Sequence, residues 1–71
     1  MSRYLMIIEE TETGFSAYSP DLPGCVATGR TRSEVEAEMR DAIDFHLEGL
    51  RLADCSIPPP RSQAAYCEVG V

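Results

Sequence analysis

The chain has 71 residues, of which 44% are hydrophobic, and its six Lys and Arg against twelve Asp and Glu give a net charge of −6. A chain of this length forms one small domain, and its ordinary apolar content argues against disorder. Binding to nucleic acid depends on basic side chains that neutralise phosphates, so the acidic balance disfavours it. It favours a basic protein partner or, equally, simple solubility.

The cysteines and the apolar runs of the sequence indicate the cellular compartment. Cys25, Cys55 and Cys67 form no C-x-x-C pair, and an odd number of cysteines without a signal peptide fits a reducing cytosol. No apolar run approaches the roughly 20 residues that span a membrane. We therefore expect a cytoplasmic protein without membrane attachment.

The first half of the chain predicts a hairpin. Residues 3–9 form the first strand candidate, and their run from Tyr4 to Ile8 is apolar at every position, as in a central strand covered on both faces. The polar residues 10–14 end in glycine, which predicts a loop to a second, antiparallel strand over residues 15–19.

A turn and a short strand follow. Pro20 removes an amide donor and ends the second strand. Pro23 and Gly24 have the dihedral preferences that a tight turn needs. Residues 25–28 are then predicted as a third strand at a sheet edge.

A helix is predicted from Thr31 to about Leu52. Thr31 and Glu34 have the spacing of a capping box, in which each side chain accepts a hydrogen bond from the other residue's amide. One apolar stripe runs along this helix at three- and four-residue intervals. The stripe consists of Val35, Met39, Ala42, Ile43, His46, Leu47 and Leu50.

A fourth strand is predicted over residues 64–69, after the stiff connection Pro58-Pro59-Pro60. Because it follows a helix, a right-handed crossover would place it parallel to the first strand. The expected fold is α+β with the order β-β-β-α-β: three antiparallel strands, a parallel fourth strand, sheet order 3-2-1-4, and the helix on one face.

One helix cannot cover both faces of such a sheet. Either Tyr4, Met6 and Ile8 or the residues between them must face away from the helix, which predicts that a second chain or a partner covers them. Phe45 lies on the flank of the helix stripe, where it makes either a rim contact or an interface. We assign Tyr4, Met6, Ile8 and Phe45 to an oligomer interface and expect a dimer or tetramer.

The sequence predicts no enzyme, no metal site and no cofactor. Glu9 and Glu10 are adjacent in a strand, so they point to opposite faces and do not readily share a metal. His46, the one histidine, lies on the apolar stripe, where a core or interface histidine is commoner than a catalytic one. No cysteine has the spacing of an activated nucleophile.

Several motifs together resemble the HicB antitoxin family. They are P-D-L-P-G-C at residues 20–25, G-x-T-x-x-E at 29–34, H-L-E-G-L at 46–50 and I-P-P-P at 57–60. The resemblance implies a degenerate RNase H-like fold without nuclease activity. It also implies an antitoxin that binds a small basic HicA-type toxin, which cleaves mRNA. An orphan HicB-like oligomer without a toxin is the alternative.

Typical full-length HicB proteins carry a C-terminal DNA-binding domain, and this chain ends at Val71. We therefore expect residues 1–71 to form one HicB-like domain without that function. The acidic loop and helix surface is the expected site for a basic partner. Its candidate residues are Asp21, Glu34, Asp41 and Glu48.

Overall fold

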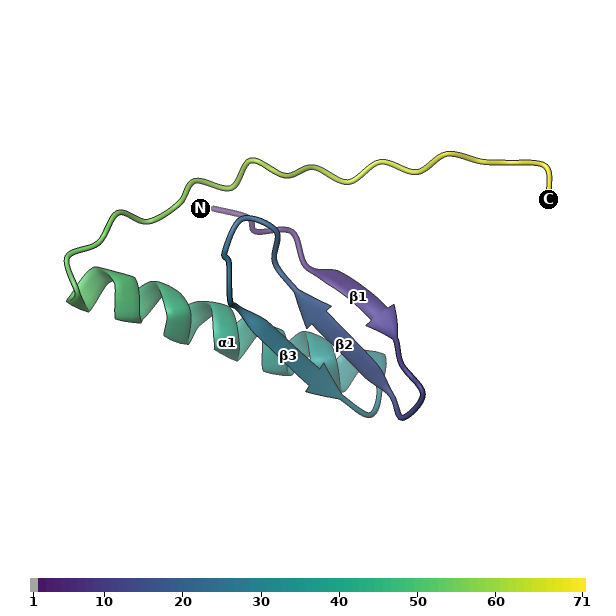
Figure 1. Cartoon of the computed structure of the whole chain (residues 1–71), viewed down its shortest axis with the longest axis horizontal. Helices are drawn as coiled ribbons and strands as arrows, with labels where there is room; N and C mark the ends of the chain where they lie inside the picture. Colours follow the sequence, from purple (N-terminus) through teal and green to yellow (C-terminus); the bar gives the residue numbers. More distant parts are fainter. Residues whose placement is uncertain (1) are drawn as a thin grey trace.

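Three strands and one long helix make up the regular part of the computed structural model, which describes residues 2–71 (Figure 1). The strands pair antiparallel in the order β1-β2-β3, and α1 packs across one face of the sheet. The predicted hairpin, third strand and helix are present, but the first strand covers residues 7–10 instead of 3–9 and the third covers 26–29 instead of 25–28. The elements are β1 (Ile7–Glu10), β2 (Phe15–Tyr18), β3 (Val26–Gly29) and α1 (Arg32–Leu52).

Two consecutive turns join β2 to β3. The Leu22 amide donates to the Ser19 carbonyl at 3.1 Å, and the Cys25 amide donates to the Leu22 carbonyl at 3.1 Å. A proline occupies the second position of each turn, as its fixed φ favours. Gly24 has a φ of 85°, which glycine adopts without the strain that a Cβ would cause.

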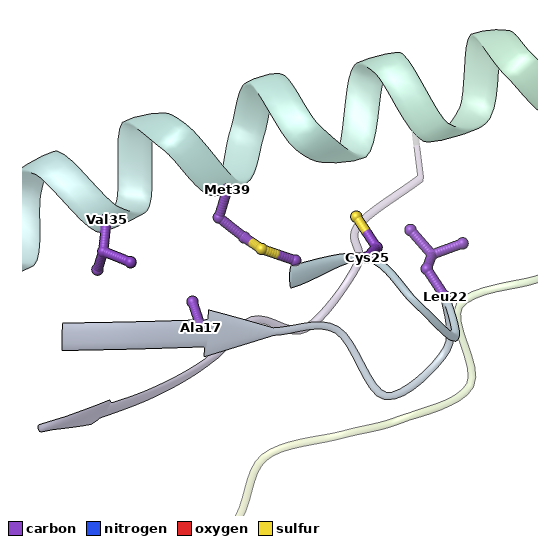
Figure 2. Packing of buried hydrophobic residues seen from close by; sticks show 5 residues of the cluster. All are labelled: Ala17, Leu22, Cys25, Val35 and Met39. Carbon is purple, nitrogen blue, oxygen red and sulfur yellow. The ribbon is translucent and has the colours of Figure 1, made fainter. Parts of the chain in front are cut away.

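The core lies between α1 and the sheet. Figure 2 shows Val35 and Met39 pointing from α1 toward Ala17 of β2, with Cys25 and Leu22 beside them from the turn segment. All five are buried. Burial in this apolar cluster raises the pKa of the Cys25 thiol. The helix stripe predicted from the sequence is thus the face that packs on the sheet.

Both ends of α1 are capped. Thr31 Oγ1 accepts from the Glu34 amide at 3.1 Å, as predicted, but the Glu34 carboxylate accepts from the Arg30 amide at 3.2 Å rather than from that of Thr31. At the other end the Cys55 amide donates to the Leu50 carbonyl at 2.9 Å. Asp54 takes a φ of 55° there, the left-handed position of a Schellman-type cap.

The predicted fourth strand and the 3-2-1-4 order are wrong. Residues 64–69 belong to no strand of the described structure, so β2 is the central strand and β1 lies at an edge. Figure 1 shows the chain after α1 running past the sheet to a distant C-terminus. Alternating side chains specify an extended backbone but no neighbour to pair with, and this segment finds none within its own chain.

Candidate protein-binding surface

Residues 2–71 contain no evident metal centre. Within that range no group of three or more His, Cys, Asp and Glu side chains could hold a metal ion. Across the same residues, no helix has both the length and the apolar character to cross a bilayer.

An acidic line of side chains follows the solvent face of α1. Its members recur at intervals of four and three residues, so they share one side of the helix, away from the packed face. All are exposed. This acidic stripe consists of Glu34, Glu38, Asp41, Phe45, Glu48 and Leu52.

Two large apolar side chains interrupt the carboxylates of the acidic stripe. Phe45 is 83% exposed and Leu52 is 77% exposed, although both lie on a helix whose other face is buried. An exposed aromatic ring surrounded by charge is typical of an anchor for a protein partner. The acidic stripe therefore combines an apolar anchor with negative charge.

Some carboxylates of the acidic stripe form hydrogen bonds or ion pairs within the chain, and others do not. Glu48 accepts a hydrogen bond from Arg51, which raises the pKa of that guanidinium, and Glu34 is held by the Arg30 amide. Within residues 2–71, neither Glu38 nor Asp41 forms an ion pair. Asp41 lies one turn and Glu38 two turns before Phe45 on the same side of α1, and both are exposed to solvent.

The structure brings together three of the four predicted partner-binding residues. Glu34, Asp41 and Glu48 lie at seven-residue spacing along the acidic stripe. Phe45, which we assigned to an oligomer interface, lies among them. Glu38 and Leu52 were not among the predicted site residues, although the same three- and four-residue spacing could have found them.

Asp21 lies elsewhere, at the turn between β2 and β3. Its Oδ2 accepts from the amides of Arg61 and Ser62 at 3.0 and 2.9 Å, and its Oδ1 accepts from the Ser62 hydroxyl at 3.1 Å. The hydrogen bond from the Ser62 amide does most to lower the pKa of this carboxyl, and desolvation opposes it. The Arg61 amide, the Ser62 hydroxyl and the Arg61 charge lower the pKa further. Asp21 therefore fastens the segment that follows α1.

The other predicted interface residues lie on the helix side of the sheet. Tyr4, Met6 and Ile8 are half-buried and pack against the core. The opposite face of the sheet carries its own apolar row, because Ile7 pairs with Tyr18 and Tyr18 pairs with Val26. This outer row is 40% exposed at Tyr18 and 65% exposed at Val26.

Comparison with known proteins gives the family. Residues 4–69 match the family model described as HicB_like antitoxin of bacterial toxin-antitoxin system. Antitoxin HicB 2 of Photorhabdus laumondii is 36% identical, over 94% of this chain and 49% of that protein. A 14.9 kDa protein from the rep-hol intergenic region of Haemophilus phage HP1 is 38% identical, over 78% of this chain and 41% of that protein.

A solved structure agrees with these relatives. A chain of the HicA3 and HicB3 toxin-antitoxin complex superimposes with a TM-score of 0.72 at 32% identity, covering 83% of this chain and 70% of that one. The chain spans less than half the length of the two sequence relatives. From the match over residues 4–69, the chain belongs to the HicB-like antitoxin family of bacterial toxin–antitoxin systems.

Proposed function

We propose that this chain is an antitoxin that binds a small, basic HicA-type toxin and occludes its RNA-cleaving surface in the cytoplasm. The acidic stripe with its exposed Phe45 is the observation that carries the proposal. The structural relative that comes from a HicA3 and HicB3 complex supports the choice of partner.

The mechanism is competition for a basic surface. A protein that binds RNA neutralises phosphates with Lys and Arg, so its RNA-binding surface is positively charged. Carboxylates along one helix face attract the same surface and raise the rate of encounter. Phe45 then supplies apolar contact area, which slows dissociation. This mechanism needs no catalytic group on the antitoxin.

The test compares two substitutions on the acidic stripe with one outside it. Asp41→Arg reverses an unpaired charge, and Phe45→Ala removes the anchor. Glu12→Arg makes the same charge reversal in the exposed β1–β2 loop and serves as the matched control. Binding to a small basic HicA-type toxin is measured by titration calorimetry.

Each stripe variant is expected to weaken the complex about tenfold or more, the effect of losing a central interface side chain. Glu12→Arg should bind within about twofold of the original chain, apart from the small long-range effect of its charge. Equal losses for all three variants, or no loss for the stripe variants, would show that the toxin docks elsewhere.

Self-association is a second part of the proposal, and the outer row of Ile7, Tyr18 and Val26 supports it. An orphan oligomer without a toxin would use the same surface. Sedimentation equilibrium at micromolar concentration is expected to give at least twice the chain mass. A chain mass at that concentration would rule self-association out.

A further inference from the structure

Gly49 is an exposed glycine inside α1, three residues before the helix ends at Leu52. Glycine is the poorest helix former after proline, so it weakens the helix there. The backbone does not require it, because Gly49 has no positive φ and the left-handed position at the helix end belongs to Asp54. Packing does not require it either, because among the described residues a Cβ at Gly49 would meet no atom within 4 Å beyond the adjacent helix backbone. The reason for the missing side chain therefore lies outside the chain's own contacts.

The bare position at Gly49 lies between two exposed apolar side chains. Phe45 is one turn before it and Leu52 is three residues after it, so the three share one side of α1. Helical side chains lean toward the N-terminus, and a side chain at position 49 would lie over the turn that carries Phe45. With Glu48, these residues have the i, i+3, i+4, i+7 spacing of the four positions that surround an inserted side chain of a partner helix.

Glu48 adds a carboxylate to the edge of this bare position. Its Oε2 accepts a hydrogen bond from Nη2 of Arg51, so a guanidinium already reaches it from the helix surface. Within residues 2–71, its other oxygen, Oε1, takes part in no hydrogen bond or ion pair. A carboxylate accepts more than one hydrogen bond, which leaves Oε1 for a second cation.

We propose that a Lys or Arg side chain of the partner lies across Gly49 and places its charged end on Glu48. Its aliphatic stem then lies between Phe45 and Leu52. Lys and Arg cover apolar surface with their stems while the charged end stays with a polar partner, which matches this arrangement. The Phe45 ring also attracts a nearby cation. The inference rests on the proposed function and names the kind of side chain that the toxin places on the acidic stripe.

Charge favours a basic side chain over an apolar one at this position. An apolar side chain would cover Glu48 without giving the carboxylate a partner, which is costly. The exposed Asp41, one turn before Phe45, adds negative charge on the same side of α1. A second copy of this chain has the same net charge of −6 and would be repelled, whereas a basic protein is attracted.

The first experiment restores a side chain at Gly49. Gly49→Ala and Gly49→Leu are compared with Ala37→Leu, which adds the same bulk at an exposed position roughly 18 Å away along the helix. Binding to a small basic HicA-type toxin is measured by titration calorimetry. Thermal unfolding followed by circular dichroism shows that each variant folds.

The expected result at Gly49 is a gain in stability together with a loss of affinity. Gly49→Ala should raise the unfolding midpoint by about 4–8 °C, because alanine favours the helix. It should nevertheless weaken binding, and Gly49→Leu should weaken it about tenfold or more by overfilling the bare position. Ala37→Leu should bind within about twofold of the original chain. Equal affinities for the Gly49 variants and the original chain would overturn the proposal.

The second experiment tests whether one partner side chain contacts both Gly49 and Glu48. Glu48→Gln, Gly49→Leu and their combination are made in a chain that also carries Arg51→Gln, so that no freed guanidinium repels the toxin. Glu48→Gln alone should weaken binding about tenfold, the effect of losing a hydrogen bond to a charged group. The combination should lose little more than Gly49→Leu alone, because the displaced side chain no longer reaches the carboxylate.

Losses that multiply in the combination would show that the two positions meet different groups of the toxin, and would overturn the proposal. Full affinity of the Glu48→Gln chain would also overturn it, because the inserted side chain would then be apolar. If the original chain binds the toxin and Gly49→Leu binds equally well, this inference fails and the proposed function stands. If the original chain does not bind a HicA-type toxin, both fail.

Discussion

Asp21 connects the turn between β2 and β3 to the segment after α1, forty residues away in sequence. Both its carboxylate oxygens accept hydrogen bonds from Arg61 and Ser62. Sequence reasoning identified the turn from Pro20, Pro23 and Gly24, because these residues act locally. It could not identify the Asp21 contacts, because a carboxylate in a turn gives no sign of which distant amides it will meet.

The Asp21 contacts predict a dependence on pH. Hydrogen bonds to the carboxylate lower the pKa of Asp21 in the folded state. Their contribution to stability is therefore present at a pH above the ordinary pKa of an aspartate, and it is lost as the pH falls through the pKa of the folded state. Below about pH 4 the protection factor of the Ser62 amide, its exchange rate compared with that of an unstructured amide at the same pH, is expected to fall in NMR hydrogen-exchange measurements. Asp21→Asn should show fast exchange already at pH 7, whereas Glu12→Gln should match the original chain. A protection factor of the Ser62 amide that does not change between about pH 7 and pH 3 would contradict this assignment.

Met39 is one of the largest fully buried side chains of the small core. It is fully buried between α1 and the sheet (Figure 2). Met39→Ala is expected to lower the free energy of unfolding by about 2–5 kcal/mol, a large part of the stability of so small a domain. Leu52→Ala, at an exposed helix position, should change it by less than about 0.5 kcal/mol. Urea denaturation measures both, and equal losses would contradict the described packing.

At the scale of elements, the helix was the most predictable part of the fold. The spacing from Val35 to Leu50 identified the buried face, and Thr31 identified the start. The acidic stripe follows from the same spacing, but only some of its residues were predicted as site residues. Carboxylates on a helix usually mark only its solvent-exposed face. The exposure of Phe45 and Leu52 among them indicates a binding surface for a protein partner instead.

The prediction of a fourth strand was wrong for a physical reason. The alternation over residues 64–69 fits an extended segment, and the segment carries no regular secondary structure. Pairing depends on a neighbour, and the contacts of Tyr4 and Asp21 with residues 58–62 set the path of the chain instead. The first strand was predicted to be central because its apolar run suggested a neighbouring strand on each side. Since residues 64–69 do not pair with it, β1 lies at an edge of the sheet.

The end of α1 offers a prediction with opposite signs at two aspartates. Asp54 has a φ of 55°, where an L-residue is strained and glycine is not. Asp54→Gly is expected to raise the free energy of unfolding by about 1 kcal/mol. Asp44→Gly, within the helix, should lower it by a few tenths to about 1 kcal/mol because of the low helix propensity of glycine. Thermal unfolding followed by circular dichroism measures both, and a loss at Asp54 would contradict the cap.

At the scale of the whole molecule, charge and uncovered surface are the leading features. A net charge of −6 on 71 residues gives a field that attracts basic partners. The helix protects one face of the sheet, while the outer row stays uncovered. The uncovered outer row follows from a fold too small to bury all of its apolar side chains.

The charge predicts how association depends on salt. Raising the salt concentration from about 0.05 to 0.5 M shortens the screening length and should lower the association rate constant with the basic toxin by about tenfold or more. Stopped-flow mixing with fluorescently labelled toxin measures this rate. The dissociation rate should change much less, because the Phe45 contact is apolar. An association rate insensitive to salt would contradict a mechanism that begins at the acidic stripe.

The most direct test of the account is inhibition of RNA cleavage. A HicA-type toxin is incubated with a labelled mRNA, and the chain is added in increasing amounts. The account predicts that cleavage falls to zero near one equivalent of chain per toxin, and that Asp41→Arg and Phe45→Ala need a clear excess while Glu12→Arg does not. Undiminished cleavage at a large excess of the original chain would contradict it.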